Sequence, residues 1–307
     1  MKKSCDISVL TKIPLVSIVT PSYNALPFII DTINSVQIQD YPAIEHIVID
    51  GGSVDGTREV LEQHPHLIWI SEPDKGQSDA INKGFRMARG EIIGWLNADD
   101  TYRPGAVSCA VDYLQAHPDV DLIYTDIQVI DEHDQPVRFI KAAPFSVETL
   151  LERNMINQPT VFMRRRVVDT LGGVDDNIQF YVMDWEFWLR AGMLFILQYL
   201  PGVVFANFRF CKGTLSHDNP AAFHKAWLEV LNDLEKSPNI EQKLYVKIKP
   251  ARKLAKKQFY FASMVKATHD GKWIEAMTDF CKAIASDWNS LFQIRTWKLL
   301  LRLILEI

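Results

Sequence analysis

The sequence predicts an α/β protein with a doubly wound, mostly parallel sheet and a helical C-terminal extension. Short apolar runs alternate with stretches of helical periodicity over the first hundred residues, and this alternation is typical of strand–helix–strand units. The apolar runs predict strands at residues 15–20, 44–50, 66–70 and 92–96. The periodic stretches between them predict helices at residues 27–37, 55–63 and 77–88.

The pattern changes after residue 120. Residues 120–130 and 137–140 predict a β-hairpin around a turn at 133–136, and a helix at 184–191 and a strand at 203–208 are expected after it. From about Pro220 onward the apolar residues recur at helical spacing throughout. We therefore expect a mixed region up to about residue 215 and helices beyond it.

The chain has 307 residues, enough for one large domain or two ordinary ones. Its formal net charge is −5, but the charge is unevenly distributed. Residues 241–307 hold 13 Lys and Arg against 6 Asp and Glu, whereas residues 1–240 hold 20 against 32. An acidic body with a basic end predicts that the two parts contact different partners.

The four cysteines argue against a zinc centre and against a disulfide framework, because they are far apart and form no CxxC pair. They are Cys5, Cys109, Cys211 and Cys281. The first residues make a poor signal peptide, and the most apolar stretch, at 191–206, is too short and too interrupted to cross a bilayer. We expect a cytoplasmic protein, and we extend this prediction to peripheral contact with the inner face of the membrane.

A loop rich in polar residues follows each of the first four predicted strands. In open α/β sheets, ligands bind at the carboxyl ends of the strands, so we expect these loops to meet in one crevice. The loops are TPSYN at 20–24, DGGSVDGT at 50–57, SEPDKG at 71–76 and NADD at 97–100.

The loop at 97–100 places two adjacent carboxylates, Asp99 and Asp100, directly after a buried strand. Proteins bind Mg²⁺ and Mn²⁺ through one or two carboxylates together with substrate phosphate oxygens, so this pair is a candidate metal site. The other interpretation is that the acids only cap a helix that starts at Pro104. The residues alone leave both interpretations open.

Three further side chains have both a chemical and a structural interpretation. Asp50 ends a strand and can bind a base or ribose, but DGGS is also a strong turn signal. Asp184 is either the cap of an amphipathic helix or a general base that faces the crevice, and Glu186 on the same helix is expected to be structural. His217 lies in a loop, where it is either a solvated residue or a metal ligand.

Several common functional motifs are absent from the sequence. It contains no Walker loop, no GxGxxG run and no serine nucleophile elbow. The three arginines at 164–166 are more typical of a solvated helix face than of a nucleic-acid site. We therefore expect no nucleic-acid partner.

Taken in order along the chain, seven runs resemble the motifs of family 2 glycosyltransferases. The runs are VTPSYN (19–24), IDGGSVDGT (49–57), SEPDKGQSDAINKG (71–84), GEIIGWLNADD (90–100), NQPT (157–160), LGGV (171–174) and MDWEFWLR (183–190). One such run would be weak, whereas seven in order are specific. The resemblance covers residues 14 to about 217.

The resemblance implies a GT-A fold and an inverting, single-displacement reaction. A sugar would move from a nucleotide-diphosphate donor, with a UDP-sugar favoured, to a hydroxyl of a glycan or lipid-linked acceptor. The implied cofactor is Mn²⁺ or Mg²⁺. Asp184 matches the general base, Asp99 and Asp100 match the acids that hold ribose and metal, and His217 is a further candidate metal ligand. The implied donor-binding residues are Thr20, Pro21, Tyr23, Asp50, Asp79, Asn82, Asn97 and Asp99.

Three positions depart from the family's pattern. Asn97 stands where the first acid of the DxD motif is often found, which lowers the negative charge beside the metal. Met183 stands where an acid often precedes the base, and an apolar neighbour raises the pKa of a carboxyl group by desolvation. Cys211 stands where the family often has a histidine, and His217 or Lys212 is the candidate replacement.

The resemblance divides the chain into a catalytic domain at 1–218 and a helical region at 219–307. Within the catalytic domain, residues of about 14–126 would form the nucleotide-sugar half and residues 127–218 the acceptor half. Residues 288–307 form a basic amphipathic stretch with two interpretations. It is either a helix on an anionic membrane surface, or a helix packed on the catalytic domain or on a second subunit of a homo-oligomer.

Two other functions fit parts of the sequence. A catalytically inactive glycan-binding or scaffold protein would account for the three departures from the pattern. A sugar nucleotidyltransferase would use a similar sheet and metal, but it needs a glycine-rich phosphate loop after the first strand. Residues 20–24 contain no glycine, which counts against it.

Overall fold

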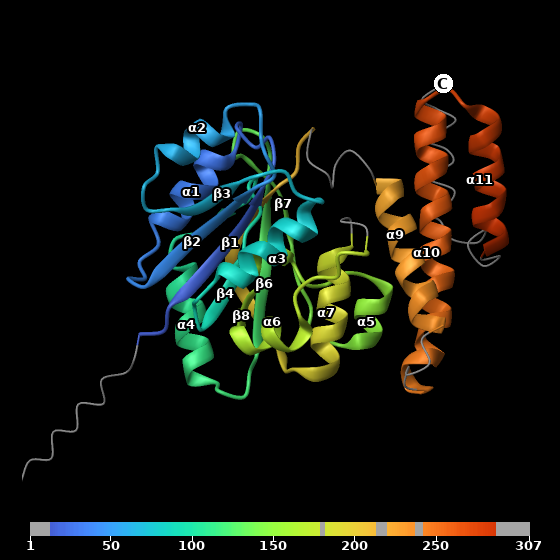
Figure 1. Ribbon diagram of the computed structural model, residues 1–307. Coiled ribbons are helices and arrows are strands. Elements are labelled where there is room, and N and C mark those ends of the chain that lie inside the picture. Colours follow the sequence, from blue (N-terminus) through green and yellow to red (C-terminus); the bar gives the residue numbers. More distant parts are fainter. Residues whose placement is uncertain (1–12, 179–181, 213–219, 237–241, 287–307) are drawn as a thin grey trace, which may run out of the picture.

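The computed structural model describes residues 13–178, 182–212, 220–236 and 242–286. One nine-stranded sheet runs through the molecule in the order β3-β2-β1-β4-β8-β6-β9-β5, and β7 pairs with β6 (Figure 1). The prediction of an α/β fold with a doubly wound, mostly parallel sheet and a helical extension is confirmed.

The four strands of the N-terminal half all run parallel. They are β1 (Val16–Ser22), β2 (Ile44–Asp50), β3 (Ile68–Ser71) and β4 (Ile92–Trp95). The helices between them are α1 (Ile29–Gln37), α2 (Thr57–Glu62) and α3 (Gln77–Met87). Each element lies within about two residues of its predicted range, because the chain turns wherever the apolar pattern is interrupted by glycine or proline.

Both faces of this sheet are covered by helices, so its strands are apolar on both sides. On β2, Ile47 and Ile49 join α3 in one core, whereas Val48 faces α1 and α2 in another. The helix α4 (Ala106–Ala116) packs on the same side as α1. It begins after Gly105, and the short strand β5 (Thr101–Tyr102) separates it from the acidic loop, so the helix does not start at Pro104 as expected.

The second half of the sheet contains the antiparallel pairings. Strands β6 (Leu122–Ile130) and β7 (Pro136–Ile140) form the predicted hairpin, and β8 (Phe162–Arg164) lies between β4 and β6. The strand β9 (Leu197–Arg209) pairs in parallel with β6 and is longer than predicted. Pro201 and Gly202 interrupt its apolar pattern, but they lie at an irregularity in the pairing and do not end the strand.

Three helices and one short 3₁₀ turn lie beside this half of the sheet. They are α5 (Val147–Glu152), η1 (Gln158–Thr160), α6 (Arg165–Leu171) and α7 (Met183–Leu194). The arginines at 164–166 tie α6 to its surroundings, since Arg165 donates to the Gly90 carbonyl and Arg166 pairs with Asp121.

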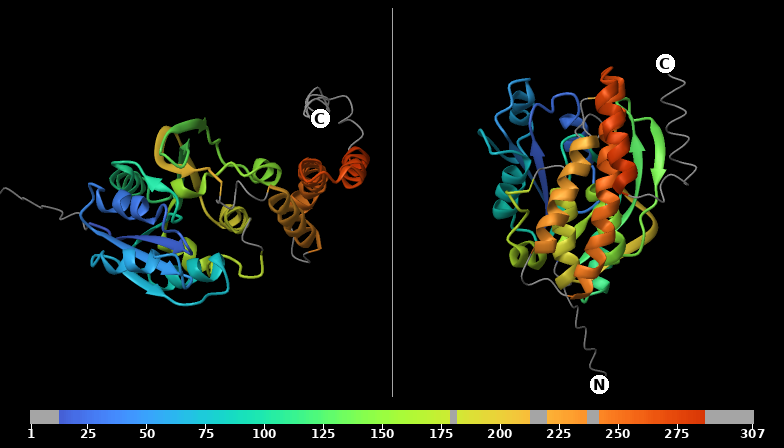
Figure 2. Two further views of the ribbon diagram at one scale, coloured as in Figure 1. Left: turned by 90° about the horizontal axis from the view of Figure 1, so that it is seen from above. Right: turned by 90° about the vertical axis from the view of Figure 1, so that its right-hand side faces the viewer.

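The C-terminal helices stack outward from α5 and α7, and α11 is the farthest from the sheet (Figure 2). They are α9 (Pro220–Lys236), α10 (Gln242–His269) and α11 (Trp273–Ser286). Trp227 of α9 packs against Trp185 of α7 with ring centroids 5.0 Å apart, and both belong to the largest apolar core. The apolar core thus continues across position 218, and the domain boundary there stays a prediction.

No helix in the described ranges is long and apolar enough to cross a membrane. The stretch at 288–307, predicted to contact a membrane or a second subunit, lies outside those ranges.

The Trp227→Ala substitution should lower the free energy of unfolding by about 3–5 kcal/mol, because it leaves a cavity beside Trp185. Trp227 is only 4% exposed. Urea unfolding measures the change, with Ile274→Ala as the control because Ile274 is 86% exposed. Equal, small losses in both variants would show that α9 does not share the core of the sheet domain.

Candidate active site

A cavity of about 910 Å³ opens at the carboxyl ends of the parallel strands. The chain order reverses between β1 and β4, so the loops after these two strands separate and leave a crevice. The residues around it come from the end of β1, from the start of α3 and from the loops after β1, β2, β3, β4 and β9. They are Pro21, Ser22, Tyr23, Asn24, Ala25, Pro27, Phe28, Gly51, Pro73, Asp74, Gly76, Gln77, Ala80, Asn97, Ala98, Asp99 and Lys212.

The loops after β1 and β2 hold each other in place. The backbone N–H of Asn24 donates to Ser53 Oγ at 2.7 Å, and Asn24 Oδ1 accepts from the N–H of Val54 at 3.0 Å. Asp55 Oδ2 accepts from the N–H of Leu26 at 3.0 Å. These crossed hydrogen bonds fix the rim of the cavity before any ligand arrives.

Asp50 lies behind this rim and is fully buried. Its carboxylate accepts hydrogen bonds from the N–H of Ser53 at 2.9 Å and from Ser71 Oγ at 2.6 Å. These contacts close the turn after β2 and leave Gly51, the next residue, on the cavity wall. The predicted turn chemistry of Asp50 is therefore present, and its role toward a nucleotide base stays a prediction.

Thr20 is also buried behind the cavity, where its Oγ1 lies 2.9 Å from Nε2 of His46. Burial lowers the pKa of His46 to about 3, so this imidazole is neutral. Pro21 and Tyr23 line the cavity, the Tyr23 side chain is largely exposed, and their predicted contact with a donor stays a prediction. Ser22 is buried on the same wall, and its Oγ has no hydrogen-bond partner within the described ranges.

The two predicted donor-binding residues on α3 stabilise neighbouring segments instead of lining the cavity. Asp79 pairs with Lys83 at 3.4 Å and accepts a hydrogen bond from the N–H of Lys75 at 3.2 Å. Asn82 donates to the Val174 carbonyl at 2.9 Å and accepts from the Val174 N–H at 3.0 Å. Asn82 thereby holds the loop before α7 against α3.

Asn97 lines the cavity, but its amide is already engaged by protein groups. Its Oδ1 accepts from Gln77 Nε2 at 3.1 Å and from Trp95 Nε1 at 3.0 Å, while its Nδ2 donates to Gln158 Oε1 at 2.9 Å. An ionised carboxylate at position 97 has no N–H to donate, so it would face the Gln158 oxygen without a hydrogen bond. This network explains why an amide is present where an acid is common.

Asp99 and Asp100 have different environments although they are adjacent. Asp99 lines the cavity, whereas Asp100 is fully buried and does not. One carboxylate oxygen of Asp100 accepts from the N–H of Arg209 at 3.0 Å, and the other has no partner among the described residues. Burial and the charge of Asp99 together raise the pKa of Asp100, and burial raises the pKa of Asp99.

This pair of carboxylates fits a hard divalent cation. Burial disfavours the ionised form of both acids, and one oxygen of Asp100 has no hydrogen-bond partner in the described structure, so a bound cation would stabilise the charged pair. Of the two acids, Asp99 is the one that lines the cavity. Within the described part of the chain no three His, Cys, Asp or Glu side chains gather into a metal site, and His217 lies outside it.

Asp184 lies in the first turn of α7 and is partly buried. Burial raises the pKa of Asp184 to about 6, and hydrogen bonds from the backbone N–H of Trp185 and from Asn154 Nδ2, the latter at 3.0 Å, partly offset that effect. The start of α7 contacts the start of α3 through Ser78 Oγ, which lies 3.2 Å from the Met183 sulfur. Gln77, beside Ser78, lines the cavity, so the start of α7 contacts a helix that forms part of the cavity wall.

Glu186 is structural, as expected, because it pairs with Arg190 at 2.6 Å. The cavity wall also includes residues that the sequence did not single out, such as Phe28, Asp74 and Gln77. Lys212, proposed only as a replacement for the missing histidine, does line the cavity, whereas Cys211 is buried. The sequence feature that pointed to Lys212 was a basic side chain shortly after the last strand of the sheet.

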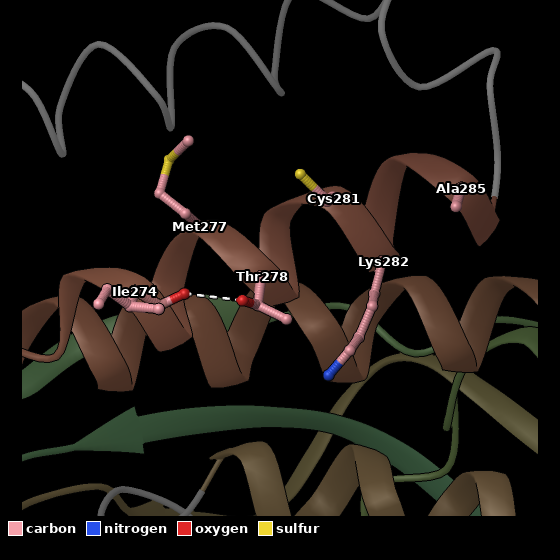
Figure 3. Close-up of a pocket in the computed structure, with 6 residues that line it drawn as sticks. All are labelled: Ile274, Met277, Thr278, Cys281, Lys282 and Ala285. Carbon is pink, nitrogen blue, oxygen red and sulfur yellow. Dashed lines mark hydrogen bonds between the residues drawn. The ribbon is translucent and has the colours of Figure 1, made fainter.

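A second hollow lies along the outer face of α11 (Figure 3). It is apolar, and its residues are Ile274, Met277, Thr278, Cys281, Lys282 and Ala285. The Thr278 hydroxyl donates to the Ile274 carbonyl at 2.8 Å, and Lys282 pairs with Asp279, so these polar groups are used within the helix. The hollow does not have the paired acids of the first cavity.

Comparison with known proteins decides the family. The profile described as "Glycosyl transferase family 2" matches residues 17–172, slightly more than half of the chain. The chain belongs to glycosyl transferase family 2. It is therefore a glycosyltransferase, and the matched region contains the loops after β1, β2, β3 and β4 that form most of the cavity.

Curated relatives agree with this family. A putative teichuronic acid biosynthesis glycosyltransferase of Bacillus subtilis, TuaG, is 26% identical over 231 residues, which is 73% of this chain and 89% of the relative. Chondroitin synthase of Escherichia coli is 33% identical over 134 residues, covering 42% of this chain and 20% of that protein.

Solved structures show the same fold at low sequence identity. TarS of S. aureus, residues 1–349 in complex with UDP-GlcNAc, has a TM-score of 0.62 at 15% identity and covers 91% of this glycosyltransferase and 92% of that chain. The mannosyltransferase PcManGT of Pyrobaculum calidifontis, in complex with GDP-Man and Mn²⁺, has a TM-score of 0.59 at 20% identity. It covers 96% of this chain and 86% of that chain. The predicted GT-A fold is confirmed.

Asp184→Asn should stabilise the protein at pH 7 by about 1–3 kcal/mol. The pKa of Asp184 is raised from 3.8 to about 6, so the folded state binds more protons than the unfolded state between these values. Wild-type stability therefore falls as pH rises through this window, and the advantage of the asparagine variant should vanish below about pH 4.

Urea unfolding from about pH 3.5 to 8 measures this difference. The control is Asp79→Asn, because backbone and Lys83 contacts outweigh burial and lower the pKa of Asp79. That variant should lose stability at pH 7. A stability difference for Asp184→Asn that is independent of pH would contradict the raised pKa.

Proposed function

We propose that this glycosyltransferase is an inverting enzyme that transfers a sugar from a nucleotide-diphosphate donor to a hydroxyl of a glycan or lipid-linked acceptor. The observation that carries the proposal is an acid on the cavity wall together with a second, desolvated acid on a helix that contacts α3, which forms part of that wall. Asp99 faces the cavity at the end of β4, and Asp184, with its raised pKa, lies at the start of α7.

The cavity suits the donor. Its volume of about 910 Å³ is within the usual range for sites that bury a ligand of this size. Tyr23 offers an exposed ring on which a nucleobase can stack, and Ser22 offers a buried hydroxyl without a partner in the described structure. The proposal of a UDP-sugar follows the TarS complex with UDP-GlcNAc and the place of Asp50 beneath the loop.

Asp184 is proposed to take the proton of the acceptor hydroxyl. The oxygen then forms a bond to the anomeric carbon as the bond from that carbon to the diphosphate oxygen breaks, and the electron pair leaves with the nucleoside diphosphate. A carboxylate with a pKa near 6 is ionised at neutral pH and is still a better base than an ordinary aspartate.

Negative charge accumulates on the departing diphosphate and needs compensation. Mn²⁺ or Mg²⁺, held by Asp99 with Asp100 behind it, would supply positive charge there when bound. Lys212 supplies a second positive charge from the cavity wall and is the only Lys or Arg side chain among the described residues that line it.

The first experiment is a thermal-shift and donor-hydrolysis panel of UDP-, GDP- and dTDP-sugars with and without Mn²⁺. We expect one nucleotide class to raise the melting temperature in a metal-dependent manner, and Asp99→Ala to abolish the metal dependence. Asp184→Asn should keep the shift and lose turnover by about 100-fold or more. No shift with any donor at millimolar concentration would favour a glycan-binding or scaffold protein instead.

Lys212→Ala should raise the KM for the donor about tenfold, because it removes a charge-assisted contact to the diphosphate. Initial rates at varied donor concentration measure the effect. Lys282→Ala on α11 is the matched control, since it removes a cation away from the cavity. An unchanged KM in the Lys212 variant would remove this residue from the donor site.

A further inference from the structure

One neutral side chain binds the carboxylate proposed as the general base. Asn154 lies in the loop between α5 and η1, and its Nδ2 donates to Asp184 Oδ2 at 3.0 Å. Neither residue lines the donor cavity. The role of Asn154 rests on the proposed function, because it acts through Asp184.

The orientation of the Asn154 amide is determined by a second contact. Its Oδ1 accepts a hydrogen bond from the backbone N–H of Ile156 at 3.1 Å. If the amide were flipped, its NH₂ group would face that N–H and its oxygen would face the carboxylate, and both contacts would be repulsive. The Asn154 amide therefore presents a donor, and only a donor, to Asp184.

The two elements that hold this pair are fixed to each other. Trp185, next to Asp184, donates from Nε1 to the Leu150 carbonyl on α5 at 2.6 Å. Trp227 of α9 also packs against Trp185, and Leu150 is fully buried. Figure 1 shows α5 and α7 side by side next to α9 and α10. The C-terminal helices thus maintain the spacing on which the hydrogen bond depends.

The charged groups on the surrounding elements are engaged elsewhere or exposed. The ion pairs on these elements include Glu186 with Arg190 on α7, Asp79 with Lys83 on α3, and Glu235 of α9 with Arg252 of α10. Lys225 with Glu229 and Lys236 with Asp233 form two more on α9. The exposed ones, on α5 and at its end, are Glu148, Glu152 and Arg153. The neutral amide is thus the side-chain partner that the structure assigns to the carboxylate.

We propose that Asn154 is the positioning residue of the base: by binding Asp184 Oδ2 it fixes the orientation in which the carboxylate receives the acceptor proton. A neutral donor suits this task. An arginine or lysine in its place would stabilise the carboxylate strongly and make it a weak base. An apolar residue would let the carboxylate rotate and would favour its protonated form.

The test uses the full chain and measures kcat/KM between about pH 5 and 9. The reaction followed is release of nucleoside diphosphate from the panel donor with the largest thermal shift. Asn154→Ala should move the acidic limb of the profile up by about 0.5–1 pH unit, and Asn154→Asp by about 1–2 units because it adds a like charge. The KM for the donor should stay unchanged. Asn34→Asp, at an exposed position of α1, is the matched control for the added charge.

A second measurement needs no substrate. The stability difference between the wild-type protein and the Asp184→Asn variant reports the pKa of Asp184, and its midpoint should move to higher pH when both proteins also carry Asn154→Ala. If neither this midpoint nor the rate profile moves, Asn154 has no positioning role even if Asp184→Asn is inactive. If Asp184→Asn retains full turnover, the proposed base itself is wrong, and the two failures are thereby distinguished.

Discussion

The geometry of the site depends on one buried positive charge, the guanidinium of Arg209. It is fully buried at the end of β9, and a charge removed from water must be compensated by nearby partners. Arg209 donates to the carbonyls of Asp99 and Asp131 at 3.0 Å each and pairs with Asp134 at 2.8 Å. Its guanidinium also stacks over the Phe28 ring at 4.5 Å. One side chain thereby joins the acidic loop, the β6–β7 turn and the start of α1.

This arrangement explains why the two adjacent acids differ. The backbone N–H of Arg209 donates to one oxygen of Asp100, and its side chain binds the carbonyl of Asp99. Asp100 is therefore held inside, and the Asp99 side chain is turned toward the cavity. The acids lie in the loop after β4, but β9, about a hundred residues later in the chain, decides which of them lines the cavity.

The proposed base depends on long-range packing in a similar way. Asp184 lies in the first turn of a helix whose position is determined by Trp185, and Trp185 contacts both α5 and α9. The helical region after residue 219 supplies Trp227 to this contact and therefore does more than extend the chain. Burial at this junction raises the pKa of Asp184, and the same burial costs stability when the group ionises.

The sequence by itself determined the alternation of strands and helices, the convergence of four polar loops and the family. These features follow from local periodicity and from residues that lie next to each other in the chain. It also identified Pro21, Tyr23, Asn97 and Asp99, which do line the cavity.

Only the tertiary structure decided which of the candidate polar residues line the cavity and which are engaged by other protein groups. Thr20, Asp50, Asp79 and Asn82 have the residue types of a binding site, yet their partners are His46, Ser71, Lys83 and Val174. Asn154, Arg209 and Trp227 could not be assigned, because their partners are 30 or more residues away along the chain. A polar side chain forms hydrogen bonds with whichever groups folding places beside it. The spacing of residues along the sequence does not show which groups those are.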